Sequence, residues 1–411
     1  MKKTLALAPL ALGLGLALCS QSAFAKEKLL VWEDLQKAYG LTEAAAAFEK
    51  EFGVEVELRE FRYTTSLDKL RLDGPAGIGA DVFVIPHDRL GYGVVQGLIR
   101  PLEFMKTDKD KYTEGSVAAL TSNGTIYGCP RSVESVVVFY NKKLLDKPFE
   151  TMEEYYDYSK KVHAADDSNY GLLAPFDQIY YAYGAISAYG GYVFKRDDSG
   201  NFDVTDVGLN NQGTIDAVTY VSKFFKEGLF PLGIIGENGL NAMDTLFTEG
   251  KTAAVVTGPW MLEPYASAKV DYGVARMPKM PNGKDMEPFM GVRSYVVSNF
   301  TKNPELAEKF IQFINQPKYA IARYEAIREI PPIKEVMANP VIKDDPIASV
   351  LADQCDHAFP MPSVPEMAEV WVPIDSALQL VATGKSEPKP ALDDAITLIN
   401  SQIEAMRTNA N

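Results

Sequence analysis

The sequence predicts an α/β fold built on a parallel sheet. Apolar, partly β-branched stretches at 29–32, 54–58 and 80–86 have the pattern of strands. Helical patterns at 42–52 and 66–72 separate them, and this β-α-β-α-β order is typical of parallel-sheet domains. The third strand, "ADVFVIP", is apolar throughout, as strands buried on both faces are. With 411 residues, the chain is long enough for two or three units of ordinary domain size.

The first 25 residues have the features of a secretory signal peptide. Lys2 and Lys3 form a short positive region, and an apolar run over 5–18 follows. The segment "SQSAFA" then has small residues at the spacing of a cleavage site, so we expect cleavage after Ala25.

A second interpretation of this end is a lipid anchor. "LALC" at 16–19 resembles a lipoprotein motif with Cys19 as the lipidated residue, but bulky Leu18 stands where such motifs have a small residue. We therefore favour free secretion into a periplasm. No later apolar run is long enough to cross a bilayer, so we expect the mature chain to be a soluble monomer.

The mature chain is acidic. The full sequence has a net charge of −14, which becomes −16 when the two lysines of the signal peptide are removed. Such a surface repels nucleic acid and anionic lipid, so no nucleic-acid partner is expected. The mature chain keeps two cysteines, Cys129 and Cys355, which are far apart and lack CxxC spacing. The sequence leaves two alternatives for them, a disulfide between the two or two buried free thiols.

Beyond Pro101 the sequence predicts further strands and helices. The expected strands are "GTIYGCP" and "SVVVFYN" on either side of "RSVE", then "GLLAPF", "KTAAVVTGPW", "DYGVARMP" and "GVRSYVVS". Helices are expected over 151–163, over "YYAYGAISAYGG" and over 213–228, and the chain from Asn303 onward is mostly helical. In the earlier part of the chain, Thr42 is the expected N-cap of the first helix.

Charged residues follow two of the predicted strands. Asp88 and Arg89 come directly after "DVFVIPH", and Lys37 lies shortly after the first strand. In open α/β sheets, ligands lie beyond the carboxyl ends of the strands, so we expect these side chains to face one crevice. His87, between the strand and Asp88, is interpreted as a packed spacer rather than a ligand contact.

The motifs argue against several kinds of chemistry. The three histidines, at 87, 163 and 357, are scattered, so no metal site is expected. There is no GxSxG motif, and the glycine-rich "GPAGIGA" precedes a strand, so neither a serine hydrolase nor a phosphate loop is predicted. A glycoside hydrolase that pairs Asp88 with Glu134 stays open as the enzymatic alternative.

The three tryptophans differ in their sequence context. Trp32 lies on the first strand and is expected in the core, whereas Trp260 follows a Gly-Pro turn and Trp371 precedes a helix. Aromatic faces at such positions suit pyranose rings, which offer C–H faces for stacking and hydroxyls for hydrogen bonds.

Seven segments together resemble a known family. They are "KLLVWEDLQKAYGL", "PHDRLGYGVVQGLI", "IYGCPRSVESVVVFYNKKLL", "AYGGYVFK", "TGPW", "PFMGV" and "MPSVPEMAEVW". In this order they are similar to the maltose/maltodextrin-binding proteins of sugar ABC transporters, in extracellular solute-binding family 1. The resemblance extends over nearly the whole mature chain.

The resemblance implies a type II periplasmic-binding-protein fold, in which two α/β lobes close like a hinge on a ligand cleft between them. The first lobe would comprise 26–132 plus 294–340, and the second 137–288 plus 346–411. Three hinge crossings would join them, near 132–136, near 289–293 and just before Pro346.

The resemblance also implies which side chains contact sugar. Asp88 and Glu134 would accept hydrogen bonds from hydroxyls, and charged groups such as Arg89 would donate them. The implied contacts are Lys37, Asp88, Arg89, Glu134, Tyr180, Trp260 and Trp371, with Asp34, Gln36, Asp68 and Gln178 as further candidates.

Four positions depart from the family pattern. Gln36 and Gln178 replace acids, Ile85 replaces a tryptophan, and Asp375 replaces an arginine. The ligand is therefore expected to be a glucan-like oligosaccharide of maltodextrin type, with a cyclodextrin or another oligosaccharide as the alternative. The loss of an aromatic at Ile85 is interpreted as the loss of a stacking surface. We expect no cofactor and no catalysis, and a membrane ABC permease as the partner.

Overall fold

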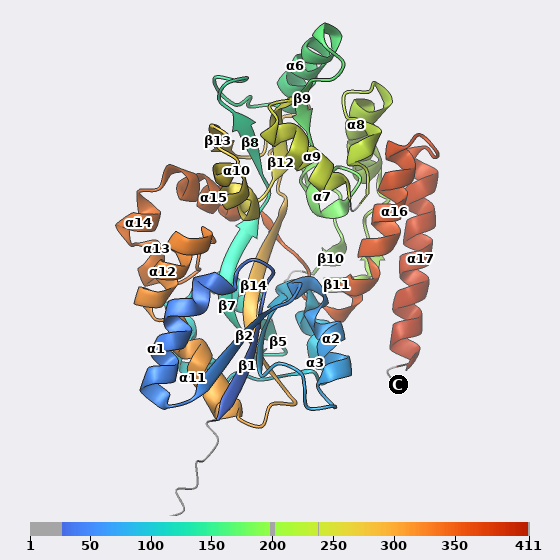
Figure 1. Ribbon diagram of the computed structural model, residues 1–411. Helices are drawn as coiled ribbons and strands as arrows, with labels where there is room; N and C mark the ends of the chain where they lie inside the picture. Colours follow the sequence, from blue (N-terminus) through green and yellow to red (C-terminus); the bar gives the residue numbers. More distant parts are fainter. Residues whose placement is uncertain (1–26, 198–201, 237, 410–411) are drawn as a thin grey trace, which may run out of the picture.

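Two β-sheets organise the fold of the computed structural model, which describes residues 27–197, 202–236 and 238–409 (Figure 1). The first sheet has seven strands, in which β15, β14, β3, β1 and β2 lie in that order while β4 and β7 also pair with β14. Its strands are β1 (Lys28–Glu33), β2 (Glu55–Glu60), β3 (Val82–Pro86), β4 (Ile99–Arg100), β7 (Gly128–Ser135), β14 (Phe289–Ser298) and β15 (Phe359–Pro360).

The predicted β-α-β-α-β unit is confirmed at the start of this sheet. β1 pairs in parallel with both β2 and β3, and β3 is fully buried up to Ile85, as its apolar sequence requires. The sheet as a whole is mixed, however, because β14 runs antiparallel to β3, β4 and β7. The prediction of a parallel sheet therefore holds for β1, β2 and β3 and for the pair of β14 with β15, but not for the whole sheet.

The second sheet has four strands in the order β13, β8, β12, β9. Their bounds are β8 (Val137–Asn141), β9 (Tyr170–Leu173), β12 (Thr252–Thr257) and β13 (Tyr272–Ala275). The chain passes from the first sheet to the second at Val136, between β7 and β8. Figure 1 shows β7 and β14 running from the lower part of the molecule toward this second sheet.

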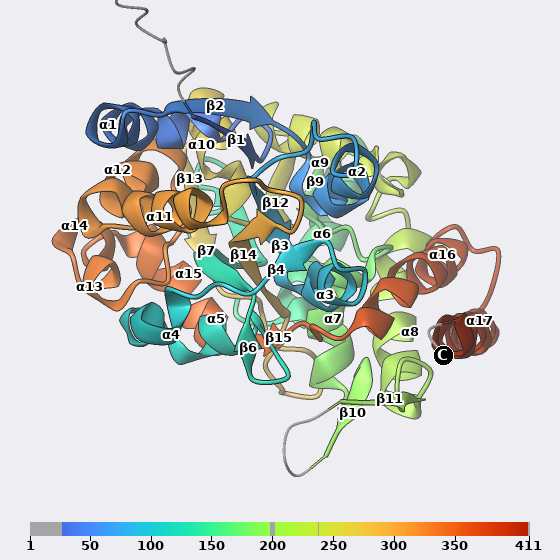
Figure 2. The same cartoon turned by 90° about the horizontal axis from the view of Figure 1, so that it is seen from below.

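Helices cover both faces of the first sheet. Seen from below, α1 and α11 lie on one side of its strands and α2 and α3 on the other (Figure 2). The helices near this sheet and beside its crossing strands are α1 (Thr42–Phe52), α2 (Ser66–Asp73), α3 (Leu90–Val95), α4 (Met105–Asp108), α5 (Glu114–Ala118), α11 (Pro304–Ile314), α12 (Pro317–Ile327), α13 (Lys334–Met337), α14 (Pro340–Lys343) and α15 (Pro346–Asp356).

The helices around the second sheet complete the fold. They are α6 (Met152–Ala165), α7 (Ile179–Ala188), α8 (Gln212–Lys226), α9 (Gly239–Thr248), α10 (Leu262–Ser267), α16 (Trp371–Ala382) and α17 (Pro388–Asn409). Two small hairpins, β5 (Thr121–Ser122) with β6 (Thr125–Ile126) and β10 (Phe194–Arg196) with β11 (Phe202–Val207), lie outside the two main sheets. None of the helices in the described ranges is long and apolar enough to cross a membrane.

Two local predictions were wrong. The segment "RSVE" does not separate two strands but belongs to β7, where it continues the pairing with β14. Thr42 is not an N-cap, because the 3-10 turn before it runs directly into α1 and Leu41 takes the cap position. By contrast, α6 begins with a complete capping box between Thr151 and Glu154, at the start that the sequence predicts.

Candidate functional site

Two adjacent cavities lie where the carboxyl ends of β1, β2 and β3 meet β7, β14 and the elements of the second sheet. The smaller cavity has a volume of about 250 Å³ and the larger about 590 Å³. Five residues line both cavities and form their junction: Tyr63, Thr64, Glu134, Tyr180 and Arg293. The two cavities are therefore neighbouring parts of one cleft.

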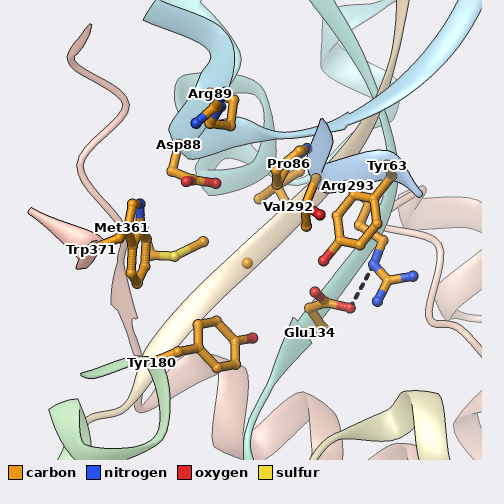
Figure 3. Close-up of a pocket in the computed structure, with 12 residues that line it drawn as sticks. Tyr63, Pro86, Asp88, Arg89, Glu134, Tyr180, Val292, Arg293, Met361 and Trp371 are labelled. Atoms are coloured by element: carbon orange, nitrogen blue, oxygen red, sulfur yellow. Dashed lines mark ion pairs between the residues drawn. The ribbon is translucent and has the colours of Figure 1, made fainter. Parts of the chain in front are cut away.

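The structure brings ten of the eleven candidate residues to this cleft. Asp88, Arg89 and Trp371 line the smaller cavity, as Figure 3 shows, and Glu134 and Tyr180 lie at the junction. The larger cavity is lined by the other candidates, Asp34, Gln36, Lys37, Gln178 and Trp260. Asp68 lines neither cavity, but it accepts a hydrogen bond of 3.1 Å from Arg89 and so helps to position that side chain.

The end of β3 presents Asp88 to the smaller cavity. His87 is completely buried, accepts a 3.0 Å hydrogen bond at Nδ1 from the Val292 amide, and contacts the Met361 carbonyl at 3.1 Å, so the packed-spacer interpretation is confirmed. Burial lowers the pKa of His87 to about 4, so its ring is neutral near pH 7. Burial likewise raises the pKa of the Asp88 carboxyl to about 6, although Arg89 and Trp371 act in the opposite direction.

Ile85, where the resemblance predicts the loss of a stacking surface, faces the core rather than the cleft. Ile85 is fully buried in an apolar cluster with Trp32 and Phe83, so its side chain does not reach either cavity. Trp32 is 3% exposed, which confirms its predicted place in the core. The aromatic side chain near this end of the sheet is Tyr63, which follows β2 and lies at the junction.

The rings of Tyr180, Trp260 and Trp371 line the cleft, and the buried ring of Phe289 lies near two of them without lining either cavity. Tyr180 lies 6.1 Å from Trp260 and 6.4 Å from Phe289, and Phe289 lies 5.9 Å from Trp371, measured between ring centroids. Tyr180 is in the first turn of α7, where the Ile179 amide donates a 2.7 Å hydrogen bond to Asp375 of α16. Asp375 therefore joins the two helices that carry Tyr180 and Trp371.

A buried ion cluster lies beneath the junction. Arg293 is 3.2 Å from Asp34, 3.0 Å from Glu329 and 2.8 Å from Glu134, and its guanidinium stacks on the Tyr63 ring at 4.5 Å. Burial and the nearby acids raise the pKa of Glu134, although Arg293 lowers it. The members of the cluster are Glu33, Asp34, Lys37, Arg131, Glu134, Arg293 and Glu329.

Some of the buried polar atoms without a hydrogen-bond partner lie in the cleft. In the described residues twelve side-chain atoms are of this kind, and four of them belong to cleft residues: Arg89 Nε, Gln178 Nε2, Tyr180 Oη and Arg293 Nε. Arg293 Nε has an ion pair with Glu134 at 2.8 Å, which leaves three cleft atoms without a partner. Buried polar groups are nearly always hydrogen-bonded, so these three atoms are places where a polar ligand would find a partner. No group of three or more potential metal ligands occurs in the described part of the chain, and Cys129 and Cys355 are both free thiols.

The sequence reasoning missed Tyr63 and Arg293, which both line the junction. Tyr63 follows the carboxyl end of a parallel strand, so the rule that selected Asp88 could have found it. Arg293 is a single charge within the apolar strand "FMGVRSYVVS", and a charge in a buried strand is a signal of its own.

The fold and the cleft define a two-sheet α/β receptor with a polar and aromatic ligand site. The chain belongs to the bacterial extracellular solute-binding proteins, which it matches over residues 43–350. It is 45% identical to the galactooligosaccharide-binding protein of Bacillus subtilis (strain 168), over 96% of each chain. It is also 33% identical to the maltodextrin-binding protein MdxE of the same organism, over 96% of this chain and 95% of the relative.

Solved structures agree with this assignment. A cyclo/maltodextrin-binding protein complexed with maltotetraose superposes with a TM-score of 0.81 at 36% identity, covering 94% of this chain and all of that one. MalX from Streptococcus pneumoniae in complex with maltopentaose gives a TM-score of 0.84 at 32% identity, over 91% of this chain and 100% of MalX. The type II sugar-binding fold that the resemblance implied is therefore confirmed, and these relatives are solute-binding proteins rather than enzymes.

Proposed function

We propose that the protein is the substrate-binding component of a sugar ABC transporter, which binds a neutral oligosaccharide and delivers it to a membrane permease. The observation that carries the proposal is the combination, in one cleft, of aromatic faces with buried polar atoms that lack partners. Sugars need both features, because their rings stack through C–H faces and their hydroxyls both donate and accept hydrogen bonds.

The charges in the cleft favour a neutral ligand. Four acids and four bases line the two cavities, so the lining carries no net formal charge. Arg89 and Arg293 already have carboxylate partners, which leaves no excess of cations to hold an anionic ligand. The acids are Asp34, Asp88, Glu134 and Glu263, and the bases are Lys37, Arg62, Arg89 and Arg293.

The ligand contacts are those that the sequence comparison suggested, apart from Asp68. Asp88, Glu134 and Lys37 would bond to hydroxyls, and Tyr180, Trp260 and Trp371 would stack on successive rings. Two cavities joined at Tyr63 and Tyr180 suit a ligand of at least two sugar units.

Closure of two lobes would complete the site. In this proposal 26–132 plus 294–340 form one lobe and 137–288 plus 346–411 the other. Two separate sheets, joined through β7 and β14, support this division, except that β15, within 346–411, pairs with β14 in the first sheet. A sugar held between them would favour the closed form by its differential affinity for that form.

Two classes of oligosaccharide are the leading ligands. Maltodextrins are favoured by the solved relatives, which hold maltotetraose and maltopentaose. Galactooligosaccharides are favoured by the relative of that name, which is 45% identical, whereas the maltodextrin-binding relative is 33% identical. The departures at Gln36, Gln178 and Asp375 agree with the second class, because they alter the maltodextrin pattern at the cleft or next to it.

Calorimetric titration tests the proposal directly. The panel is maltose, maltotriose, α- and β-cyclodextrin and a β-galactooligosaccharide, each titrated into the same protein preparation. We expect one class to bind with a Kd far below 1 mM, and a galactooligosaccharide preference would exclude plain maltodextrin as the main ligand. Failure of every sugar to bind below about millimolar would refute the assignment of an oligosaccharide.

We propose that binding occurs without chemistry. Asp88 and Glu134 both line the smaller cavity, the arrangement on which the glycoside hydrolase alternative depends. Glu134, however, is engaged by Arg293, which does not leave it free as a general acid. Incubation with the best ligand followed by chromatography separates the alternatives: a receptor returns the sugar intact, and a hydrolase releases shorter products.

Export is part of the proposal, since the family is extracellular. The cleavage after Ala25 and the alternative anchor at Cys19 lie outside the described residues. A relative from Streptococcus pneumoniae is named a solute-binding lipoprotein, which supports the anchor as the second candidate. Mass spectrometry of the mature N-terminus decides between a free Lys26 and a lipidated Cys19.

A further inference from the structure

The residue at the centre of the cleft that no comparison assigns is Arg293. It lies on β14 between the two cavities, is 4% exposed, and contributes to the lining of both. In Figure 3 its guanidinium lies beside Tyr63 and Glu134, with the ion pair to Glu134 dashed. This position raises the question of whether Arg293 supports the site or contacts the ligand itself.

The backbone of β14 has a special geometry at this position. Its pairing with β7 shifts register between Arg293 and Ser294, so Ser132 faces Arg293 while Pro130 faces Ser294. Arg131 is thereby left without a partner in β14. Such bulges redirect side chains and are frequent next to functional sites. Here the bulge lies between two buried arginines, Arg131 and Arg293.

The two arginines share a carboxylate but face different surroundings. Both ion-pair with Glu329, and Arg131 also pairs with Glu33 at 3.1 Å. Arg131 is 1% exposed and lines neither cavity, whereas Arg293 lines both. The fold therefore provides an internal comparison between a purely buried arginine and one at the cleft.

The guanidinium of Arg293 keeps donor capacity for a ligand. Its Nη1 donates to Asp34 and Glu329, and its Nε faces Glu134 at 2.8 Å without hydrogen-bond geometry. None of the hydrogen bonds among the described residues involves Nη2. Three carboxylates and the Tyr63 ring fix the planar group, so the remaining donor is held in a defined direction.

We propose that Arg293 is a specificity-determining residue that donates a hydrogen bond from Nη2 to a hydroxyl of the sugar unit at the junction of the two cavities. The inference rests on the proposed function and deepens it. A rigid charged donor raises the affinity for a sugar whose hydroxyl points toward it. It lowers the affinity for a sugar whose hydroxyl points elsewhere. Sugars that differ at one stereocentre are therefore discriminated at this position.

The test compares ligand selectivity between Arg293→Lys and the matched control Arg131→Lys. Selectivity is the ratio of Kd values for maltotriose and a β-galactotriose, measured by calorimetry. Lysine keeps the positive charge but removes Nη2 and the fixed fork. We expect Arg293→Lys to change the ratio by about tenfold or more, because charged hydrogen bonds are among the stronger ones. Arg131→Lys should lower the thermal midpoint and leave the ratio unchanged.

If the ratio of Kd values changes by the same small factor in both variants, the inference is overturned and Arg293 has a structural role only. Should Arg293→Lys not fold, a crystal structure of the wild-type protein with its best ligand decides. A ligand oxygen within about 3.2 Å of Nη2 is expected, and a ligand seated without any oxygen near the guanidinium contradicts it. If the wild-type protein binds no sugar of the panel, the proposed function fails instead, before Arg293 is tested.

Discussion

The Asp88 carboxyl predicts an affinity for sugar that falls in mild acid. Burial raises its pKa to about 6, and it faces the smaller cavity, where a hydroxyl would donate to the ionised form. A group with this pKa is about 97% ionised at pH 7.5 and about 9% at pH 5. If only the ionised form accepts the bond at full strength, Kd rises by up to about tenfold, or about 1.4 kcal/mol. Calorimetric titration at a series of pH values measures this change.

The same carboxyl has the opposite effect on stability. A folded-state pKa above the unfolded value of about 3.9 means that the folded chain binds the proton more tightly, so the contribution to stability is present in acid and is lost as the pH rises through 6. A weaker affinity at pH 5 is thus not a consequence of acid unfolding at Asp88, and a thermal melt at each pH checks this.

Matched variants isolate the carboxyl that is responsible. Asp88→Asn removes the titration and should give a weaker but nearly pH-independent Kd. Asp244 is the control, because burial also raises its pKa to about 6 but it lines neither cavity. Asp244→Asn should retain the pH dependence of the wild type. An equal slope in wild type and Asp88→Asn would refute the reasoning.

Three further changes test the walls of the cleft. Trp260→Ala should weaken sugar binding by about 1–3 kcal/mol in calorimetry, whereas Trp32→Ala in the core should instead lower the free energy of unfolding by about 3–5 kcal/mol in a denaturant titration. Gly258 lines neither cavity, but Gly258→Ala places a Cβ 2.2 Å from the Trp260 ring and should displace this ring. We expect a loss of sugar affinity in the same titration. An unchanged Kd would show that binding does not need the Trp260 ring in this position. Asp375→Asn should raise the thermal midpoint at pH 8 and not at pH 4, because burial raises the pKa of Asp375 to about 7 and its stabilising contribution is lost as the pH rises.

Sequence reasoning reached the elements with strong local patterns. The buried strand β3 and helix α6 have clear signals, continuous apolar character in one and a capping box in the other. It failed where tertiary structure decides: "RSVE" reads as polar between two strands, yet its charges are buried because Arg131 and Glu134 find partners far away in sequence. Local pattern carries no information on such distant pairs.

In the candidate site, too, some residues could be predicted from local sequence and others depend on the tertiary structure. The strand-end rule found Asp88 and Lys37, because the carboxyl ends of parallel strands meet at one edge. The wall formed by Tyr180 and Trp371 depends on the packing of α7 against α16, which only the fold sets. Ile85 stands where the resemblance has a tryptophan, and its burial in the core could not be predicted from that match alone.

The ion cluster under the junction gives a physical reason why a neutral sugar would be bound so deep. Its seven members are four carboxylates and three cations, so one negative charge is in excess. Glu329 has three cations around it, which hold its pKa at about 2, whereas burial raises the pKa of Glu134, whose ion pair is with Arg293. Among the four carboxylates of the cluster, Glu134 lines both cavities and Asp34 lines the larger one. A sugar hydroxyl that donated to Glu134 would add a second partner for this carboxylate, so the proposed ligand would complete a network whose other members are already fixed.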